Sequence, residues 1–106
     1  MTQQYTGEDI QDGIVRFTAS WCQPCKAYKP IFDKVGNILD VDFFVVDIEQ
    51  YPELAEQHNV MSIPAVFRVR GGEWERFESV PTAPELRDAV DNWDTNLSDI
   101  RQTEDE

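Results

Sequence analysis

The sequence is poor in basic residues and has no long apolar run. Nine Lys and Arg stand against 21 Asp and Glu, and the formal net charge of −12 opposes binding to nucleic acid or to an anionic membrane surface. No apolar stretch approaches the roughly 20 residues of a transmembrane helix. Residues 1–5 are neither basic nor followed by an apolar run, so no signal peptide is predicted. These absences favour a cytoplasmic protein without a membrane span.

Cysteine and histidine are also scarce, which limits the chemistry that the chain can support. Cys22 and Cys25 are the only cysteines, and His58 is the only histidine. Three potential ligands fall short of the four that close a structural zinc site, so we expect no metal. We also expect no cofactor apart from the cysteine pair itself. In a reducing cytosol, a single CxxC pair is typical of redox chemistry rather than of a structural disulfide.

The two cysteines lie between a predicted strand and a predicted helix. Residues 13–19 carry the apolar pattern of a buried strand, and from about Cys22 to Leu39 the apolar residues recur at helical spacing. Cys22 is therefore expected at a helix N-terminus, where free N–H groups and the helix dipole favour a thiolate. We interpret Cys22 as the attacking sulfur and Cys25, one turn later, as the more buried thiol.

Further motifs along the chain give the cysteine pair a family context. Residues 21–26 read WCQPCK, and they are followed by VDIE at residues 46–49, by Ile63 and Pro64 before a predicted strand, and by a Gly-Gly turn. In this order and at nearly this spacing, the sequence resembles the thioredoxin family from about residue 13 to residue 93. The resemblance implies an α/β fold with a central mixed sheet flanked by helices, and Pro64 in the cis form beside the cysteines.

The resemblance also implies an activity, the reduction of protein disulfides. Cys22 would attack a disulfide of a client protein, and Cys25 would resolve the mixed disulfide. The implied partners are disulfide-containing client proteins and a recharging enzyme such as a thioredoxin reductase. Two alternatives stay open: a binding module that keeps the fold for a partner, and a thiol oxidase or isomerase.

Residues around the cysteines are predicted to support the chemistry or to bind the client. Gln23 and Pro24 separate the two thiols and influence their redox potential; Pro24 matches the reducing pattern, whereas Gln23 replaces the glycine usual in the family. Lys26 completes the motif. For Trp21, packing in the core is an equal alternative to client binding. The residues expected to line the client groove are Trp21, Ile63, Pro64 and Val80.

Two positions on the predicted strands also depart from the family pattern. Arg16 stands where thioredoxins usually carry a buried acid, and Val45 stands where they carry the lysine often paired with it. A buried arginine is costly unless a carboxylate meets it, and Asp47, on the same face of the neighbouring strand as Val45, is the expected partner. A thiolate stabilised by Arg16 would favour the oxidase or isomerase alternative.

We expect one domain over residues 13–101, preceded by a short N-terminal segment, 1–12, and followed by an acidic tail, 102–106. The N-terminal segment is too short for both the first strand and the first helix of the family. The sheet is therefore expected to have about four strands, with residues 41–48 at an edge. Negative charge should keep the protein monomeric, with weak pairing through that edge only at high salt. An apolar stripe over residues 86–100 predicts a long last helix.

Overall fold

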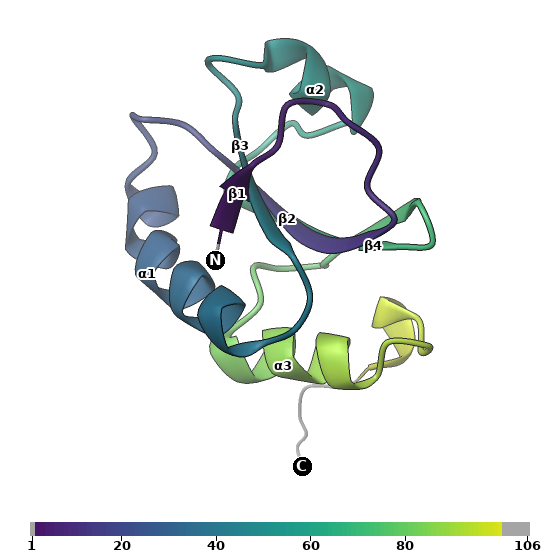
Figure 1. The fold of residues 1–106 in the computed structure, drawn as a ribbon. Coiled ribbons are helices and arrows are strands. Elements are labelled where there is room, and N and C mark those ends of the chain that lie inside the picture. The colour runs from purple at the N-terminus through teal and green to yellow at the C-terminus, as the bar shows by residue number, and fades with distance from the viewer. Residues whose placement is uncertain (1, 101–106) are drawn as a thin grey trace.

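The computed structural model describes residues 2–100 as a five-stranded mixed sheet with helices on both faces (Figure 1). The strand order is β1-β3-β2-β4-β5, in which β1, β3 and β2 are parallel and the other two pairings are antiparallel. The strands are β1 Thr2–Gln4, β2 Asp12–Thr18, β3 Phe43–Asp47, β4 Ala65–Arg70 and β5 Glu73–Arg76. The helical elements are α1 Gln23–Ile38, α2 Pro52–Gln57, α3 Ala83–Asp91 and the 3-10 turn η1 Leu97–Asp99. None of the helices in this part of the chain is both long and apolar enough to cross a membrane.

The central strands form because their residues can be buried on both faces. In β2 the run from Gly13 to Phe17 is buried without interruption, which is typical of a parallel strand covered by helices. α1 then connects β2 to β3 as the crossover of a βαβ unit. β4 and β5 form a hairpin whose turn residues, Gly71 and Gly72, have φ of 60° and 82°. Glycine adopts these angles without steric strain.

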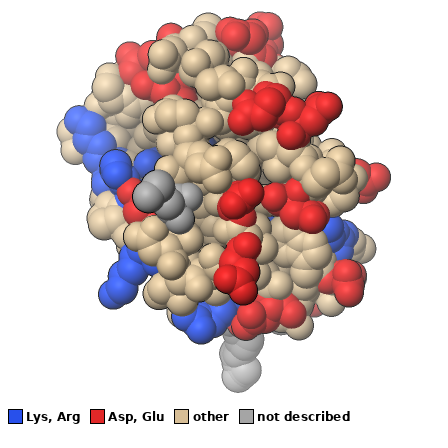
Figure 2. Space-filling model, viewed as in Figure 1, with Lys and Arg blue, Asp and Glu red and all other residues tan. Residues whose placement is uncertain are grey.

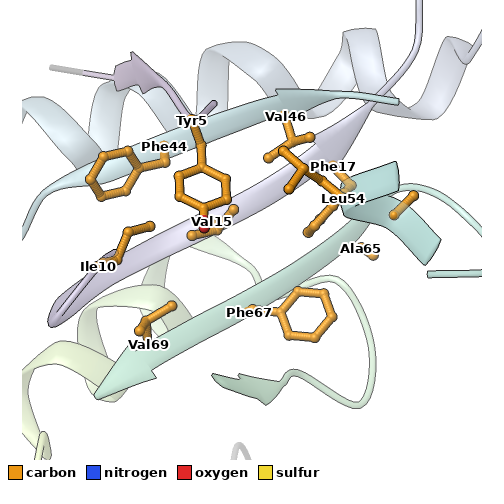
Figure 3. Close-up of a cluster of buried hydrophobic side chains, with 11 residues drawn as sticks. Tyr5, Ile10, Val15, Phe17, Phe44, Val46, Leu54, Ala65, Phe67 and Val69 are labelled. Atoms are coloured by element: carbon orange, nitrogen blue, oxygen red, sulfur yellow. The ribbon is translucent and has the colours of Figure 1, made fainter. Parts of the chain in front are cut away.

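The sheet separates two apolar clusters. On one face, α1 and α3 cover a cluster that includes Ile14 and Phe43. On the other face, α2 and the chain between β1 and β2 cover a cluster that includes Tyr5, Phe17 and Leu54 (Figure 3). The chain passes from the carboxyl end of the central strand β2 into α1. The cysteine motif therefore lies at that end of the sheet, between the two layers.

The expectation of four strands with residues 41–48 at an edge is wrong. Residues 2–4 pair with residues 43–45 as β1, and the Tyr5 N–H continues the pairing by donating to the Val45 carbonyl oxygen at 2.9 Å. The N-terminal segment has room for this strand because no helix follows it; the chain reaches β2 through a connection that buries Tyr5 and Ile10. The proposed pairing of two molecules through an exposed β3 therefore has no basis.

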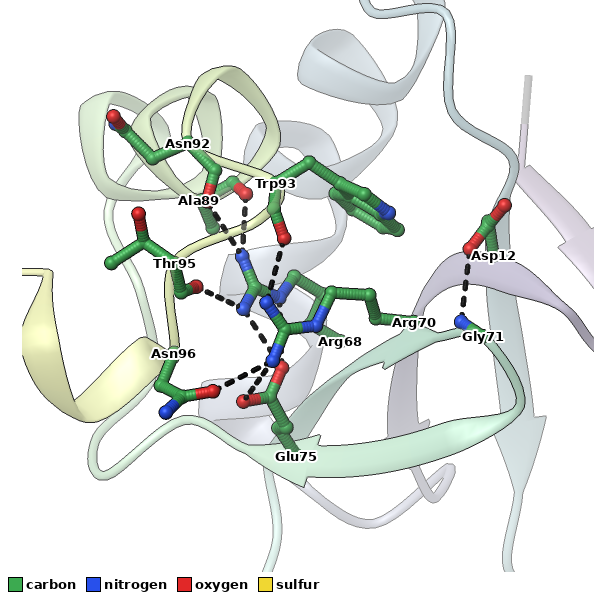
Figure 4. A network of polar contacts seen from close by, with 10 residues as sticks. All are labelled: Asp12, Arg68, Arg70, Gly71, Glu75, Ala89, Asn92, Trp93, Thr95 and Asn96. Carbon is green, nitrogen blue, oxygen red and sulfur yellow. Dashed lines mark hydrogen bonds and ion pairs between the residues drawn. The ribbon is translucent and has the colours of Figure 1, made fainter.

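The last helix is also shorter than expected. α3 ends at Asp91, although Trp93 and Leu97 still contact the core as the apolar stripe predicts. The reason lies in β4, where the buried Arg68 binds the carbonyl oxygens of Ala89, Asn92 and Thr95 and draws the chain into a turn (Figure 4). The predicted acidic tail, residues 102–106, lies outside the described residues.

Candidate active site at the start of α1

Cys22 is the N-cap residue of α1. Its backbone is extended, with φ of −90° and ψ of 103°, and its Sγ accepts a hydrogen bond from the Cys25 N–H at 3.2 Å. Its carbonyl oxygen accepts the first helical bond, from the Lys26 N–H at 3.1 Å. Pro24 lies in the first turn, where the missing N–H costs nothing because that group would have no partner in the helix. The predicted position of Cys22 at a helix N-terminus is confirmed.

Cys22 and Cys25 form a disulfide, with their Cα atoms 5.2 Å apart. The separation falls in the usual range for this bond. Both residues are buried, Cys25 completely and Cys22 with 4% of its surface exposed. They contact Ala19 from the end of β2, and the partly buried Ile48 and Ile63 pack against this group. The arrangement holds two sulfurs at a helix N-terminus in apolar surroundings.

Apolar side chains close in sequence to Cys22 and Ile63 are exposed. Trp21 is 63% exposed and Met61 is 94% exposed, so neither is core packing. Ile63 and Pro64 are partly buried and joined by a cis peptide bond, which confirms the expected conformation. Of these residues, Met61 has no place in the sequence-based prediction, although its position two residues before Ile63 would have suggested it. The other exposed residues within the motif are Gln23, Pro24 and Lys26.

A hydrogen bond ties the segment before α3 to α1. The Tyr28 hydroxyl donates to the Pro81 carbonyl oxygen at 2.7 Å in a buried setting. Burial raises the pKa of Tyr28 far above its ordinary value, while Arg16 has a smaller opposing effect, so the group remains a donor throughout the physiological range. Val80, at the start of this fixed segment, is 36% exposed and thus available to a ligand.

The expected pairing of Arg16 with Asp47 is wrong. Arg16 is buried in β2, and its guanidinium lies over the Phe32 ring, 5.4 Å from the ring centroid. Its electrostatic partner is Asp33 of α1; burial lowers the Arg16 pKa, and Asp33 partly offsets that effect. Asp47 instead accepts a hydrogen bond from the Glu49 N–H at 2.8 Å, within the turn that follows β3.

His58, the C-cap residue of α2, is half-buried. It stacks on Trp74 with ring centroids 3.7 Å apart, and its Nε2 is buried without a hydrogen-bond partner in residues 2–100. Burial lowers the His58 pKa. Within residues 2–100, no group of three or more His, Cys, Asp or Glu side chains is arranged to hold a metal ion.

The comparisons with known proteins agree with this geometry. The sequence profile of the thioredoxin family matches residues 3–92. Thioredoxin H2-1 of Oryza sativa is 39% identical over 61 residues, which cover 57% of this chain and 44% of the rice protein. The thioredoxin of Staphylococcus haemolyticus is 34% identical over 77 residues, 69% of this chain and 74% of that protein.

The fold has solved counterparts as well. A mutant thioredoxin from Halobacterium salinarum superposes with a TM-score of 0.77 at 20% identity, over 87% of this chain and 89% of the other. That likeness concerns the fold. The matched part of the present chain spans about half the length of several curated relatives, between 44% and 49%.

Proposed function

Because the chain belongs to the thioredoxin family, we propose that it is a thiol-disulfide oxidoreductase that reduces protein disulfides. The observation that carries the proposal is the Cys22–Cys25 disulfide at the N-terminus of α1, with the Cys25 N–H donating to the Cys22 sulfur. This donor and the helix dipole stabilise negative charge on Cys22 once the disulfide is reduced.

The reaction consists of two exchanges. The Cys22 thiolate attacks one sulfur of the client disulfide, forms a mixed disulfide and releases the other client sulfur as a thiolate. Cys25, as a thiolate, then attacks the Cys22 sulfur; the mixed disulfide breaks, the second client thiolate leaves, and the Cys22–Cys25 disulfide forms. Two electrons pass to the client. A recharging enzyme such as a thioredoxin reductase must supply two electrons for the next cycle.

The proposed client-binding surface consists of apolar side chains beside Cys22. Trp21, Met61 and Val80 are exposed, and Ile63 packs against the disulfide itself. An extended client segment would cover these side chains and bring its own disulfide to Cys22. We further propose that the protein acts in the cytoplasm, since a reducing compartment maintains such a pair as a dithiol. We also propose that it acts as a monomer.

The alternatives gain no support from the site. The oxidase or isomerase alternative depends on Arg16, yet in the described chain the Arg16 guanidinium lies over the Phe32 ring and its charge is offset by Asp33 of α1. A binding module would not need the sulfur chemistry of Cys22 at a helix N-terminus. The two possibilities are separated by the behaviour of the cysteine variants.

The test is reduction of insulin disulfides with dithiothreitol as the electron source. We expect turnover by the native protein and none above the dithiothreitol background by Cys22→Ser or Cys25→Ser. Only Cys25→Ser should accumulate a covalent adduct with the client on a non-reducing gel. An adduct formed by Cys22→Ser instead reverses the two roles, and undiminished turnover by both variants shows that the cysteines are not the redox centre.

The client surface has its own test. Trp21→Ala should raise KM for insulin about fivefold to tenfold, because the lost apolar contact is worth roughly 1 kcal/mol or slightly more. Ile38→Ala is the matched control, since Ile38 is also an exposed apolar residue, 57% accessible, at the other end of α1. Equal effects of the two variants would remove the proposed surface.

A further inference from the structure

A hollow of about 280 Å³ lies between α1 and the sheet, lined by residues from β1, β2, β3 and α1. Its polar lining comprises Thr2, Gln4, Arg16, Lys29, Asp33 and Asn37. Gln4, Lys29 and Asn37 are exposed, so the hollow is accessible from solvent, whereas Arg16 forms its buried wall. None of these residues takes part in the disulfide exchange.

Arg16 brings unused hydrogen-bonding capacity to this hollow. Only 4% of its surface is exposed, and its Nε and Nη1 atoms are buried without an acceptor among the described residues. Asp33 does not supply one, because its two oxygens are engaged elsewhere: Oδ1 accepts from the Thr2 hydroxyl and Oδ2 from the Lys29 ammonium, each at 2.6 Å. Buried N–H groups of a charged side chain are normally hydrogen-bonded, so the site is complementary to an acceptor that residues 2–100 do not provide.

The charges around the hollow favour an anion. Arg16 and Lys29 are positive and Asp33 is negative, which leaves one net positive charge among the lining residues. The surroundings reinforce it: Lys26, Lys29 and Lys34 are all in α1, although the chain as a whole carries a net charge of −12. Figure 2 shows most of the basic side chains of this face on the side of the molecule where α1 lies, and most of its acidic side chains elsewhere.

We propose that this hollow binds a small carboxylate anion, with the Arg16 guanidinium as its main ligand. One net positive charge matches a singly charged ion, and the planar fork of arginine matches the two oxygens of a carboxylate. The unpartnered Nε and Nη1 groups belong to different edges of the guanidinium. The amide groups of Gln4 and Asn37 provide additional donors at the rim.

The test is a titration of the oxidised, ¹⁵N-labelled protein with sodium acetate, replacing sodium fluoride at constant ionic strength. The Nε–H resonance of Arg16 is the direct readout. We expect it to shift with a saturable dependence on acetate, together with the backbone resonances of Thr2 and Asn37. A shift that rises linearly without saturation overturns the proposal. Saturable binding of sodium phosphate more tightly than acetate overturns the assignment of a carboxylate.

Variants identify the ligands. Arg16→Met should weaken acetate binding about tenfold or more, since a charge-assisted hydrogen bond is lost. Lys29→Met should weaken it about twofold to fivefold, as expected for an exposed charge, and the matched control Lys34→Met, which removes the same charge outside the hollow, should weaken it less than Lys29→Met does. Acetate affinity that is the same in Arg16→Met and in the native protein contradicts the site even if all variants fold.

Discussion

Two arginines are buried on the same face of the sheet, and we predict that replacing them by methionine has opposite effects on stability. Arg68 has no exposed surface, and its guanidinium is fully occupied (Figure 4). Nη1 donates to the carbonyl oxygens of Ala89 at 2.8 Å and Asn92 at 3.3 Å, and Nη2 donates to Glu75 at 2.8 Å and to the Thr95 carbonyl at 2.5 Å. These bonds join β4 to the end of α3.

Methionine keeps the unbranched apolar stem of Arg68 but has no donor. Removing one partner from a buried ionic network costs about 3–5 kcal/mol. Glu75 retains Arg70 at 3.4 Å and some solvent, so the lower end applies and we expect a loss of about 3 kcal/mol. The buried Ala89 carbonyl, which loses its donor, accounts for about 1–3 kcal/mol of that loss. At about 4 °C or more per kcal/mol for a chain of this size, Tm should fall by at least about 12 °C.

Arg16→Met is the counterpart. Arg16 is almost as buried, but its Nε and Nη1 atoms have no acceptor, so methionine removes a desolvated charge without leaving a partner unsatisfied. The lost attraction to the Phe32 ring and to Asp33 reduces the gain, and we expect a stabilisation of about 1 kcal/mol. Urea unfolding of the oxidised proteins, followed by circular dichroism in carboxylate-free buffer, measures both. Changes of the same sign in the two variants would refute the reasoning.

Three further predictions concern single side chains. Stability should decrease as pH falls from about 7.5 towards 5.5, because His58 is protonated near pH 6.5 in the unfolded chain while burial keeps its pKa lower in the folded one. His58→Phe should flatten this pH dependence of the free energy of unfolding, measured with urea. An unchanged pH dependence would assign it to other groups. Gly36→Ala should lower stability by about 1 kcal/mol in the same assay, because a Cβ would lie 2.9 Å from Phe43 Cγ and overpacking outweighs the gain in helix propensity; a more stable variant would contradict this. Tyr28→Phe should cost about 1–3 kcal/mol through the lost bond to Pro81, and no change in the urea midpoint would mean that another donor replaces it.

The candidate site was predictable because its determinants are local. A buried strand, two cysteines three residues apart and a proline in the first turn place Cys22 at a helix N-terminus, and the backbone of Cys22 and the N–H of Cys25 confirm it. The cis conformation at Pro64 was predicted from the family resemblance and not from propensity, since the cis form of such bonds is the minority state.

The existence of β1 and the end of α3 were not predictable, because both depend on contacts with residues far away in the sequence. Three residues are too few to read as a strand, and β1 exists because β3 offers it free backbone groups. The apolar stripe past residue 91 correctly marks side chains that face the core, such as Trp93 and Leu97. It carries no information about the donors of Arg68, which bind the carbonyl oxygens at the end of the helix.

The partner of Arg16 shows where reasoning from strand register stops. The rule that a buried arginine needs a carboxylate is general, and the register pairs Arg16 with Val45, which made Asp47, two residues along, the natural choice. That choice assumes that the side chain runs along the sheet. An arginine is long enough to cross to the next layer, and here it lies over the Phe32 ring of α1, where Asp33 supplies the nearest opposing charge to act on its pKa. The Asp33 carboxylate in turn accepts hydrogen bonds from Lys29 and Thr2. The unpartnered N–H groups of Arg16 therefore result from the way β1, β2 and α1 meet, which only the folded chain shows.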